Sequence, residues 1–507
     1  MGAIMDSGSM TRRSLLRTAF LAASSIAGAG LLAACGQAPA PTATPAPAKP
    51  AEPAPTPTQP AQKPTAAPAV QPTATPVPAA QPSATPVAKP TAAAAPIKLK
   101  FHGRNVAFDD IYVDLVKEYM AKHPNVTIEY ERTASGEYLQ KQLIMAAAGT
   151  FGDAVGPNWP YGVFYKFAYN GIYIDHLPYI KAAKFDLDAL LPQAVEVVTI
   201  GGKVYGLPHS AHPGTVGMFI NKTMFEKAGV PVPKMEWTQE AHPGLKDWTY
   251  DDALKAALAL TKREGGRTTQ FGIYIAGGTG QLYTLLMSFG GDYINPEGTK
   301  TTLDTPEALA AIQWLADLYN KHKVSPRPAD LPTGGPDLFA SGKLAMASTQ
   351  VYMLKQAHEA YKDLDWMVIP MPRGKAGVDA HIGVDVWGVL STSKHPDIAF
   401  DVISTFASYE TGLRQAQWGG VPGSQKAVWD NADLLKDPNF AVFARMIKTI
   451  SGLRTAANLR TDEWETEWRR LFTPLWVGEE TDVQKLVKEA TPRLDAILAK
   501  PRAGLTG

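Results

Sequence analysis

The apolar and polar positions that follow residue 96 alternate between two periods. Ile97–Phe101 alternates residue by residue, as in a strand, and Phe108–His123 then carries apolar side chains at helical spacing. Further segments of the two kinds follow in turn, at 126–130 (strand), 138–148 (helix), 154–155 (strand) and 161–170 (helix). This order of strands and helices predicts a doubly wound α/β sheet.

A second set of strands and helices is predicted beyond residue 200. Gly201–Pro208 has the glycines of a hairpin turn and leads into extended chain, which we interpret as a crossing into another lobe. The second set begins at Val216. About 410 residues follow the N-terminal segments, roughly twice the length of one ordinary domain, so we expect two lobes with separate cores.

The N-terminus has the pattern of a signal peptide, which we place at residues 1–34. Arg12, Arg13 and Arg17 precede the apolar stretch Ala19–Ala34, which is too short for a stable membrane span. The stretch ends in Leu-Ala-Ala before Cys35, the only cysteine of the chain, and this ending resembles a bacterial lipobox. We therefore expect Cys35 to be lipidated and to anchor the exported chain at the outer face of the cell membrane.

The arginine pair also bears on the export route. Thr11–Arg17 (TRRSLLR) resembles the twin-arginine motif of the pathway that exports folded cargo. The alternative is a general secretory signal that carries adjacent arginines. Met10 directly precedes the motif, so translation can start at Met1 or at Met10.

Residues 35–96 consist of the cysteine and a tether that cannot form a core. Residues 37–96 hold 18 of the 42 prolines, four charged residues and no aromatic residue. Copies of Pro-Thr-Ala-Thr-Pro recur at 41–45 and 72–76, which predicts a mixture of polyproline II and coil. At about 3.1 Å per residue such a segment can reach about 190 Å.

The small net charge of the chain excludes some classes of binding partner. Lys and Arg total 49 and Asp and Glu total 48, so the chain lacks the excess positive charge that attracts nucleic acid. Past residue 30 we find no apolar run of about 20 residues, so any membrane attachment comes from the N-terminus.

Short segments that follow one another between residues 205 and 480 carry a further signal. They are 205–208 (YGLP), 218–222 (MFINK), 225–231 (FEKAGVP), 248–252 (WTYDD), 289–293 (FGGDY), 339–346 (FASGKLAM), 393–400 (SKHPDIAF), 420–423 (GVPG) and 478–480 (GEE). In this order they resemble family 1 extracellular solute-binding proteins, the maltose-binding-protein-like receptors of ABC importers. The resemblance covers about 97–499.

The resemblance implies a type II periplasmic-binding-protein-like fold, in which two α/β lobes joined by crossing strands close over a solute. It implies an N-terminal lobe at 97–209 and 378–430 and a C-terminal lobe at 213–372 and 436–499. It also implies an extracytoplasmic, monomeric binding protein that delivers a carbohydrate to the transmembrane subunits of an ABC permease, without catalytic residues, cofactor or metal.

Candidate ligand-binding rings follow from the chemistry of sugars. A sugar site needs flat rings that stack on C–H faces and planar polar groups that form paired hydrogen bonds. Residues just past strand ends line the crevice of an open α/β sheet. Trp159 has that position after Gly156-Pro157-Asn158, and the resemblance implies rings at Trp159, Tyr352 and Trp464. The alternative for each is a ring that packs in the core.

Asp385 and Trp387 lie at the predicted second crossing, where alternate residues of a strand share one face. We expect them to face the cleft together, and the alternative is a buried tryptophan under a carboxylate. Other candidates follow strands or open helices, namely His102, Arg104, Tyr138, His209, Ser210, Gln281 and Tyr283. No acidic cluster matches the hydroxyl-binding carboxylates of maltose-type receptors, which argues against a maltodextrin.

Patterns that suggest an enzyme or a metal site are weak. Ser391–Lys394 has the spacing of acylating enzymes without their partner motifs, and Ser393 fits a helix N-cap better. His209 and His212 lack a third metal ligand at a recognisable spacing. Glu129 and Glu131 could form a glycosidase pair but read as solvated strand residues. The alternatives to a carbohydrate receptor are a receptor for a polyol phosphate, polyamine or peptide, a receptor that signals without transport, and a surface glycosidase.

Overall fold

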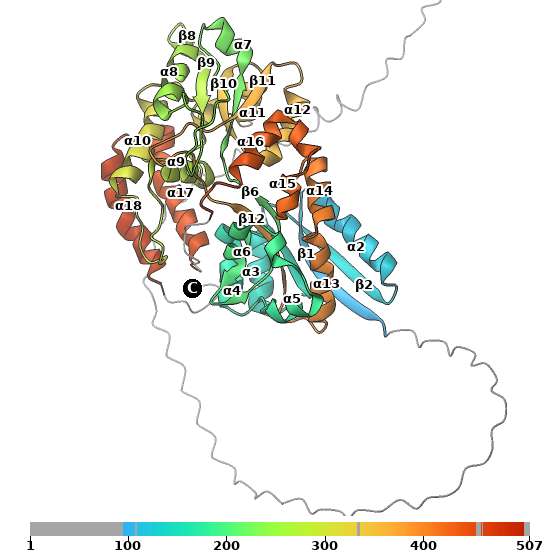
Figure 1. The fold of residues 1–507 in the computed structure, drawn as a ribbon. Coiled ribbons are helices and arrows are strands. Elements are labelled where there is room, and N and C mark those ends of the chain that lie inside the picture. Colours follow the sequence, from blue (N-terminus) through green and yellow to red (C-terminus); the bar gives the residue numbers. More distant parts are fainter. Residues whose placement is uncertain (1–94, 107–108, 332–334, 453–457, 459, 501–507) are drawn as a thin grey trace, which may run out of the picture. The chain divides into compact units, whose positions relative to one another are not determined.

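The computed structural model describes residues 95–106, 109–331, 335–452, 458 and 460–500. All of them lie within one compact unit, Lys89–Gly507. Their strands form two five-stranded sheets and a separate two-stranded hairpin, and each five-stranded sheet is the centre of one lobe (Figure 1). The two-lobed α/β fold predicted from the sequence is therefore confirmed.

The first sheet combines early and late segments of the chain. Its strand order is β2-β1-β3-β12-β6, with β1 parallel to β2 and β3, and β12 antiparallel to β3 and β6. The strands are β1 (Ile97–Asn105), β2 (Val126–Ala134), β3 (Ala154–Asn158), β6 (Leu207–His212) and β12 (Gly383–Val389). The strand ends that follow β1 and β3 therefore lie at the same edge of this sheet.

The second sheet is built from the middle of the chain. Its strand order is β11-β7-β10-β9-β8, with β7 antiparallel to its two neighbours and β9 parallel to β10. The strands are β7 (Gly217–Asn221), β8 (Lys262–Glu264), β9 (Arg267–Tyr274), β10 (Leu344–Thr349) and β11 (Trp366–Pro370). The separate hairpin consists of β4 (Thr199–Ile200) and β5 (Lys203–Val204), where the sequence predicted a turn.

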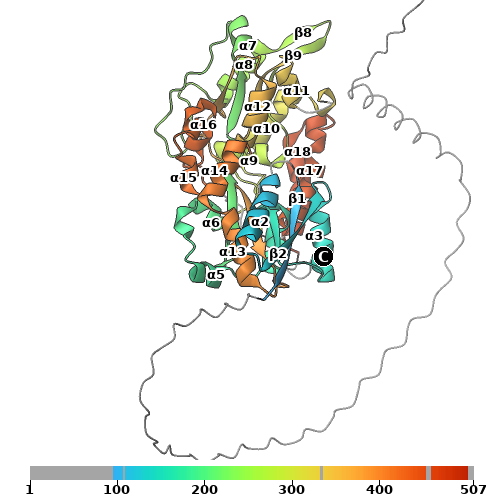
Figure 2. The ribbon, with the colours of Figure 1, turned by 90° about the vertical axis from the view of Figure 1, so that its right-hand side faces the viewer.

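Helices pack around both sheets. Those associated with the first sheet are α2 (Asp110–Lys122), α3 (Tyr138–Ala148), the π-helical turn η2 (Pro160–Phe164), α4 (Tyr165–Tyr169), α5 (Leu177–Ala183), α6 (Pro192–Val198), α13 (Pro396–Phe406), α14 (Tyr409–Trp418) and α15 (Lys426–Trp429). Helices α2 and α13 lie side by side in this lobe (Figures 1 and 2).

The second lobe contains the longest helices. Its helices are α7 (Lys222–Lys227), α8 (Tyr250–Leu260), α9 (Thr279–Phe289), α10 (Pro306–Asn320), α11 (Gly335–Ala340), α12 (Leu354–Ala360), α16 (Pro438–Met446), α17 (Thr461–Val477) and α18 (Val483–Leu498). Helices α17 and α18 lie side by side, and α17 also reaches η2 of the first lobe (Figures 1 and 2). Short 3-10 turns are η3 (Leu187–Ala189), η4 (Pro328–Asp330), η5 (Val351–Met353) and η6 (Leu434–Lys436).

Three segments cross between the two sheets. The chain passes from β6 to β7 through 213–216, returns from β11 to β12 through 371–382, and passes from α15 to α16 through 430–437. The strands and helices predicted between 97 and 170 are confirmed, and 161–170 divides into η2 and α4. The exact lobe boundaries remain a prediction.

An aromatic cluster forms the core of the first lobe. The Trp387 ring is fully buried, and its centroid lies within 6.1 Å of the ring centroids of Phe101 and Tyr112. A Cβ atom on Gly156 of β3 would lie 2.6 Å from the Trp387 ring, so glycine at this position makes room for the indole.

Candidate functional site

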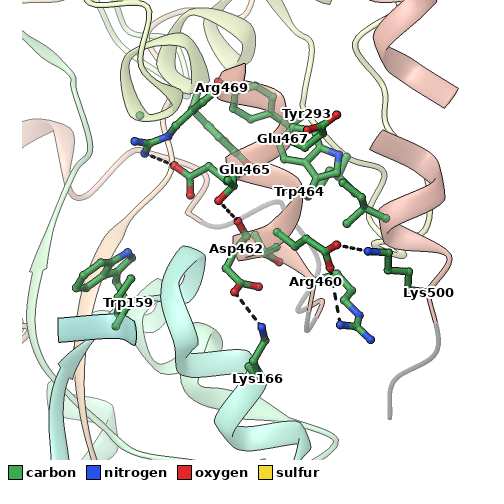
Figure 3. Close-up of a pocket in the computed structure, with 18 of the residues that line it drawn as sticks. Trp159, Lys166, Tyr293, Arg460, Asp462, Trp464, Glu465, Glu467, Arg469 and Lys500 are labelled. Atoms are coloured by element: carbon green, nitrogen blue, oxygen red, sulfur yellow. Dashed lines mark hydrogen bonds and ion pairs between the residues drawn. The ribbon is translucent and has the colours of Figure 1, made fainter. Parts of the chain in front are cut away.

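A cavity of about 1390 Å³ lies where α17 faces the first lobe (Figure 3). We call it the main cavity. The first lobe lines it with Leu139, Leu143, Trp159 and Lys166, and the second lobe with Tyr283, Tyr293, Ile294, residues of α17, Ile497 and Lys500. Because both lobes supply its walls, a molecule bound in it would contact both.

A second cavity of about 300 Å³ adjoins the main one, and we call it the side cavity. It shares Trp159 and His381 with the main cavity. Its other lining residues include Arg104, His212, Tyr352 and Asp385, which come from the ends of strands and from the crossing segments. Trp159 therefore stands at the junction of the two cavities.

The position of Trp159 is fixed by the buried end of β3. The Asn158 side-chain amide donates to the Tyr173 hydroxyl at 2.7 Å and to Gln142 Oε1 at 2.9 Å, while Gln142 Nε2 donates back to Asn158 Oδ1 at 3.0 Å. These three side chains are buried, and their hydrogen bonds tie β3 to α3. The indole that follows is thus held at the carboxyl end of a rigid strand.

Arg104, at the end of the neighbouring strand β1, completes the support. Its guanidinium carbon lies 5.6 Å from the centroid of the Trp159 ring, and its Nε and Nη2 donate to the two carboxylate oxygens of Asp109 at 2.8 and 3.3 Å. Burial alone would lower the pKa of Arg104, but the carboxylates of Asp385 and Asp109 raise it above its ordinary value. Arg104 is therefore a permanent cation beside the indole.

Two carboxyl groups in this region have altered acidity. Burial raises the pKa of Asp109 to about 6, against the opposing effect of Arg104. Burial also raises the pKa of Asp385, and Arg104 and a hydrogen bond from the Ser210 hydroxyl at 3.5 Å partly oppose this shift. Asp385 lines the side cavity, so it offers a polar group near the crossing segments.

Aromatic rings form the wall of the main cavity opposite Trp159. The ring centroid of Tyr283 lies 5.0 Å from those of both Tyr293 and His381, and the Tyr293 ring packs edge-on against Trp464 at 5.4 Å. Trp464 is only 3% exposed, and its indole nitrogen donates to the Thr301 hydroxyl at 3.1 Å. The aromatic rings of the second lobe thus fix one another in position in the cavity wall.

The N-terminal half of α17 adds a row of charged side chains, several of them visible in Figure 3. The main cavity is lined by four basic and four acidic side chains, namely Lys166, Arg460, Arg469, Lys500, Asp462, Glu463, Glu465 and Glu467. They pair with neighbours: Lys166 with Asp462, Arg460 and Lys500 with Glu463, Arg469 with Glu465, and Glu467 with Arg470. The charged part of the lining is therefore balanced, and it lies beside the apolar and aromatic part.

Six of the candidate ligand-binding residues predicted from the sequence line the two cavities. They are Trp159, Tyr283 and Trp464 in the main cavity and Arg104, Tyr352 and Asp385 in the side cavity, with Trp159 common to both. Their contact with a solute remains a prediction, but the fold brings them together.

The expectation that Asp385 and Trp387 face the cleft together is wrong. Trp387 is buried in the aromatic core of the first lobe, whereas Asp385 lines the side cavity. The pairing register of β12 shifts between Asp385 and Val386 against β6, and again between Val386 and Gly388 against β3. Such irregularities break the alternation of faces on which the expectation rested.

Five other candidates lie outside the lining of both cavities. His102 is buried beside Phe151 and accepts a hydrogen bond from the Gly152 amide, and His209 is buried in a hydrogen bond of 2.7 Å to Tyr112. Ser210 is buried, Tyr138 is 1% exposed, and Gln281 lies in the first turn of α9. None of the five lines either cavity in the described part of the chain.

Sequence reasoning missed all eight charged residues of the main cavity. They include four carboxylates near the start of α17, namely Asp462, Glu463, Glu465 and Glu467. Trp464 was the one candidate selected from this helix, and a run of charges on a helix ordinarily indicates a solvated face. Two tryptophans, Trp464 and Trp468, stand among these charges four residues apart, and both are buried. Their presence in the sequence indicates that one face of the helix is covered.

The described residues contain no group of three or more histidine, cysteine, aspartate or glutamate side chains arranged to hold a metal ion. They also contain no helix with the length and apolarity required to cross a membrane. The predicted export and lipidation residues Arg12, Arg13 and Cys35 lie outside the described residues.

Known proteins resemble this chain in sequence and fold. A binding protein of Brucella abortus (strain 2308) is 26% identical over 404 residues, which cover 77% of this chain and 90% of the relative. An arabinooligosaccharide-binding protein of Halalkalibacterium halodurans is 24% identical over 257 residues, which cover 48% of this chain and 52% of the relative.

A solved structure, the ABC substrate-binding protein Lmo0181 from Listeria monocytogenes in complex with cycloalternan, superposes with a TM-score of 0.66 at 23% identity, covering 80% of this chain and 100% of that one. The sequence pattern of bacterial extracellular solute-binding proteins matches residues 106–412. The chain therefore belongs to the family of bacterial extracellular solute-binding proteins and is a binding protein rather than an enzyme.

Proposed function

We propose that this protein captures a carbohydrate between its two lobes. The observation that carries the proposal is the composition of the main cavity, where Trp159 of the first lobe faces a wall containing Tyr283, Tyr293 and Trp464 of the second. Aromatic rings stack on the C–H faces of sugars, and carboxylate and guanidinium groups form paired hydrogen bonds with their hydroxyls. Supply of these groups from both lobes favours binding to a closed form.

The charge balance favours a neutral solute. The charged side chains of the main cavity form ion pairs with one another, so an added phosphate or ammonium group would meet partners that are already neutralised. A hydroxyl can instead join such a pair without removing either charge. This supports a sugar over a polyol phosphate or a polyamine.

The sugars bound by two of the compared proteins agree with this proposal. One is an arabinooligosaccharide-binding protein, and the other was solved in complex with cycloalternan. The main cavity also exceeds the volume of about 300–1,000 Å³ that is usual for small-molecule sites. We therefore favour an oligosaccharide over a monosaccharide.

We further propose that the chain serves an ABC importer from a lipid anchor. The family acts outside the cytoplasm. Lipidation of Cys35 and a tether over 37–96 would keep the lobes near the membrane while allowing a wide search. The permease would then read the closed, liganded arrangement of the lobes.

A thermal-shift screen tests the proposal. The protein is heated with members of a carbohydrate library, and with a polyamine, a peptide and a polyol phosphate. A ligand present at about 100 times its Kd adds about 2.7 kcal/mol of stability, so the correct sugar raises the melting temperature. A shift with a non-sugar alone contradicts the proposal, and so does release of products from a labelled oligosaccharide.

A further inference from the structure

Asp462 lies in the wall of the main cavity, at the start of a helix. It lies in the first turn of α17, which packs on α18 in the second lobe, and it lines the cavity. The first turn of a helix favours a negative charge, because the backbone N–H groups there are unpaired and the helix dipole is positive. Asp462 is therefore well placed at the start of α17, at the boundary between the lobes.

One oxygen of Asp462 reaches across to the first lobe. Its Oδ2 lies 3.0 Å from Nζ of Lys166, which belongs to α4, and Figure 3 shows the two side chains pointing toward each other. The Lys166 side chain is 9% exposed and that of Asp462 is 24% exposed. Low exposure reduces screening, so the two charges attract each other more strongly than on the surface, and removal of one of them would leave the other poorly solvated.

The other oxygen has a different environment. Asp462 Oδ1 is buried and has no hydrogen-bond partner among the described residues. A buried acceptor without a donor is unfavourable, which makes an incoming donor correspondingly favourable. Asp462 lines the main cavity, so a molecule bound there can supply that donor when the atoms that cover Oδ1 move aside.

We propose that Asp462 couples solute capture to contact between the lobes, with Oδ1 accepting a solute hydroxyl while Oδ2 holds Lys166. The inference rests on the proposed function as a carbohydrate receptor. A solute that donates to Oδ1 fixes the carboxylate in the orientation that binds Lys166. The same carboxylate therefore recognises the solute and holds the lobes in contact around it.

The contact between lobes is tested without solute. Nitroxide labels are placed on cysteines at Lys181 of α5 and Lys488 of α18, both exposed, in the full chain carrying Cys35→Ser. The distance distribution is measured by double electron–electron resonance. We expect Lys166→Gln and Asp462→Asn each to reduce the ratio of short to long distances about tenfold. Exchange of the two residues, Lys166→Asp with Asp462→Lys, should restore the ratio.

The control is the exposed pair Glu118 and Arg414, which lies within the first lobe. Their joint replacement by glutamine should leave the distance distribution unchanged. Identical distributions in all variants, with unchanged melting temperatures, overturn the lobe contact. A change in Lys166→Gln that the exchanged pair does not restore also overturns it.

The role of Oδ1 is tested with cycloalternan and an arabino-oligosaccharide as probes. By calorimetry, Lys166→Gln should weaken binding about tenfold, and Asp462→Ala should weaken it about tenfold further because the hydroxyl acceptor is also removed. Equal losses in the two variants overturn the role of Oδ1. If the unaltered chain binds no sugar, the proposed function fails, and so does the role of Oδ1 as a hydroxyl acceptor. The distance measurement still decides whether the Lys166–Asp462 pair holds the lobes in contact.

Discussion

The guanidinium of Arg104 lies against the indole of Trp159, 5.6 Å from the ring centroid, while its nitrogens bind the buried carboxylate of Asp109. The Arg104 cation therefore has two roles. It neutralises a carboxylate inside the first lobe, and it supports the ring that stands between the main cavity and the side cavity. Stability and the geometry of the site depend on the same side chain.

Replacement of Arg104 by methionine should destabilise the protein by about 3–5 kcal/mol, because Asp109 would be left as a buried carboxylate without its cation. Urea denaturation followed by fluorescence measures this change. Addition of Asp109→Asn should recover much of the loss, since no charge then remains unpaired. Equal stability of the single and double variants would show that the ion pair does not account for the effect.

The two tryptophans of the first lobe should respond differently to alanine. Trp387→Ala should cost about 3–5 kcal/mol of stability, because it empties the aromatic core. Trp159→Ala should change stability less but weaken sugar binding by about 2 kcal/mol, or roughly thirtyfold. Chemical denaturation and calorimetry on both variants separate the effects. Unchanged sugar affinity in Trp159→Ala would remove this ring from the binding site.

The sequence predicted Trp159 well because its position depends on a simple rule. The residue after a central strand lies at the sheet edge, whatever the rest of the chain does. Trp387 was misplaced because its orientation depends on local changes in pairing register, which alternation along one strand does not reveal. Side-chain direction within a strand is thus less predictable than the end of the strand.

The charged wall of α17 could not be predicted for another reason. Charged residues on a helix are ordinarily solvated, and the position of Asp462 in the cavity wall depends on Lys166 of α4, almost 300 residues earlier in the chain. The Lys166–Asp462 pair exists only because two lobes meet, and a single sequence carries no signal of that contact. Features formed between distant segments therefore required the structure.

The predicted anchor can be tested independently of the site. In cells, Cys35→Ala should release the protein from the membrane fraction, and mass spectrometry of the unaltered chain should find a lipid on an N-terminal Cys35. The physical reason is that the acyl chains of the predicted lipid on Cys35 would hold the chain at the bilayer by burying their CH2 groups in it. Replacement of Arg12 and Arg13 by lysine tests the twin-arginine route, and normal export of that variant would favour the general secretory route.

Stability should also fall in mild acid, because burial lowers the pKa of five histidines, namely His102, His176, His209, His212 and His381. Burial lowers the pKa of His176 and His212 to about 4 and that of His209 and His381 to about 3. An unfolded histidine has a pKa of about 6.5, so below that pH the unfolded chain binds more protons and the folded state loses stability as pH falls toward 4.

Two carboxyl groups act in the opposite direction. The pKa of Asp109 is raised to about 6 and that of Asp385 is also raised, so the folded state gains protons there before the unfolded state does and is stabilised as pH falls through this range. Because five histidines oppose two carboxyl groups, we expect a net slope in which stability is lost as pH falls from about 6.5 toward 4. Urea denaturation between pH 7.5 and 4.5 measures it. His209→Gln, which removes one titrating ring, should lower the slope by about one proton, and an unchanged slope would contradict the assignment.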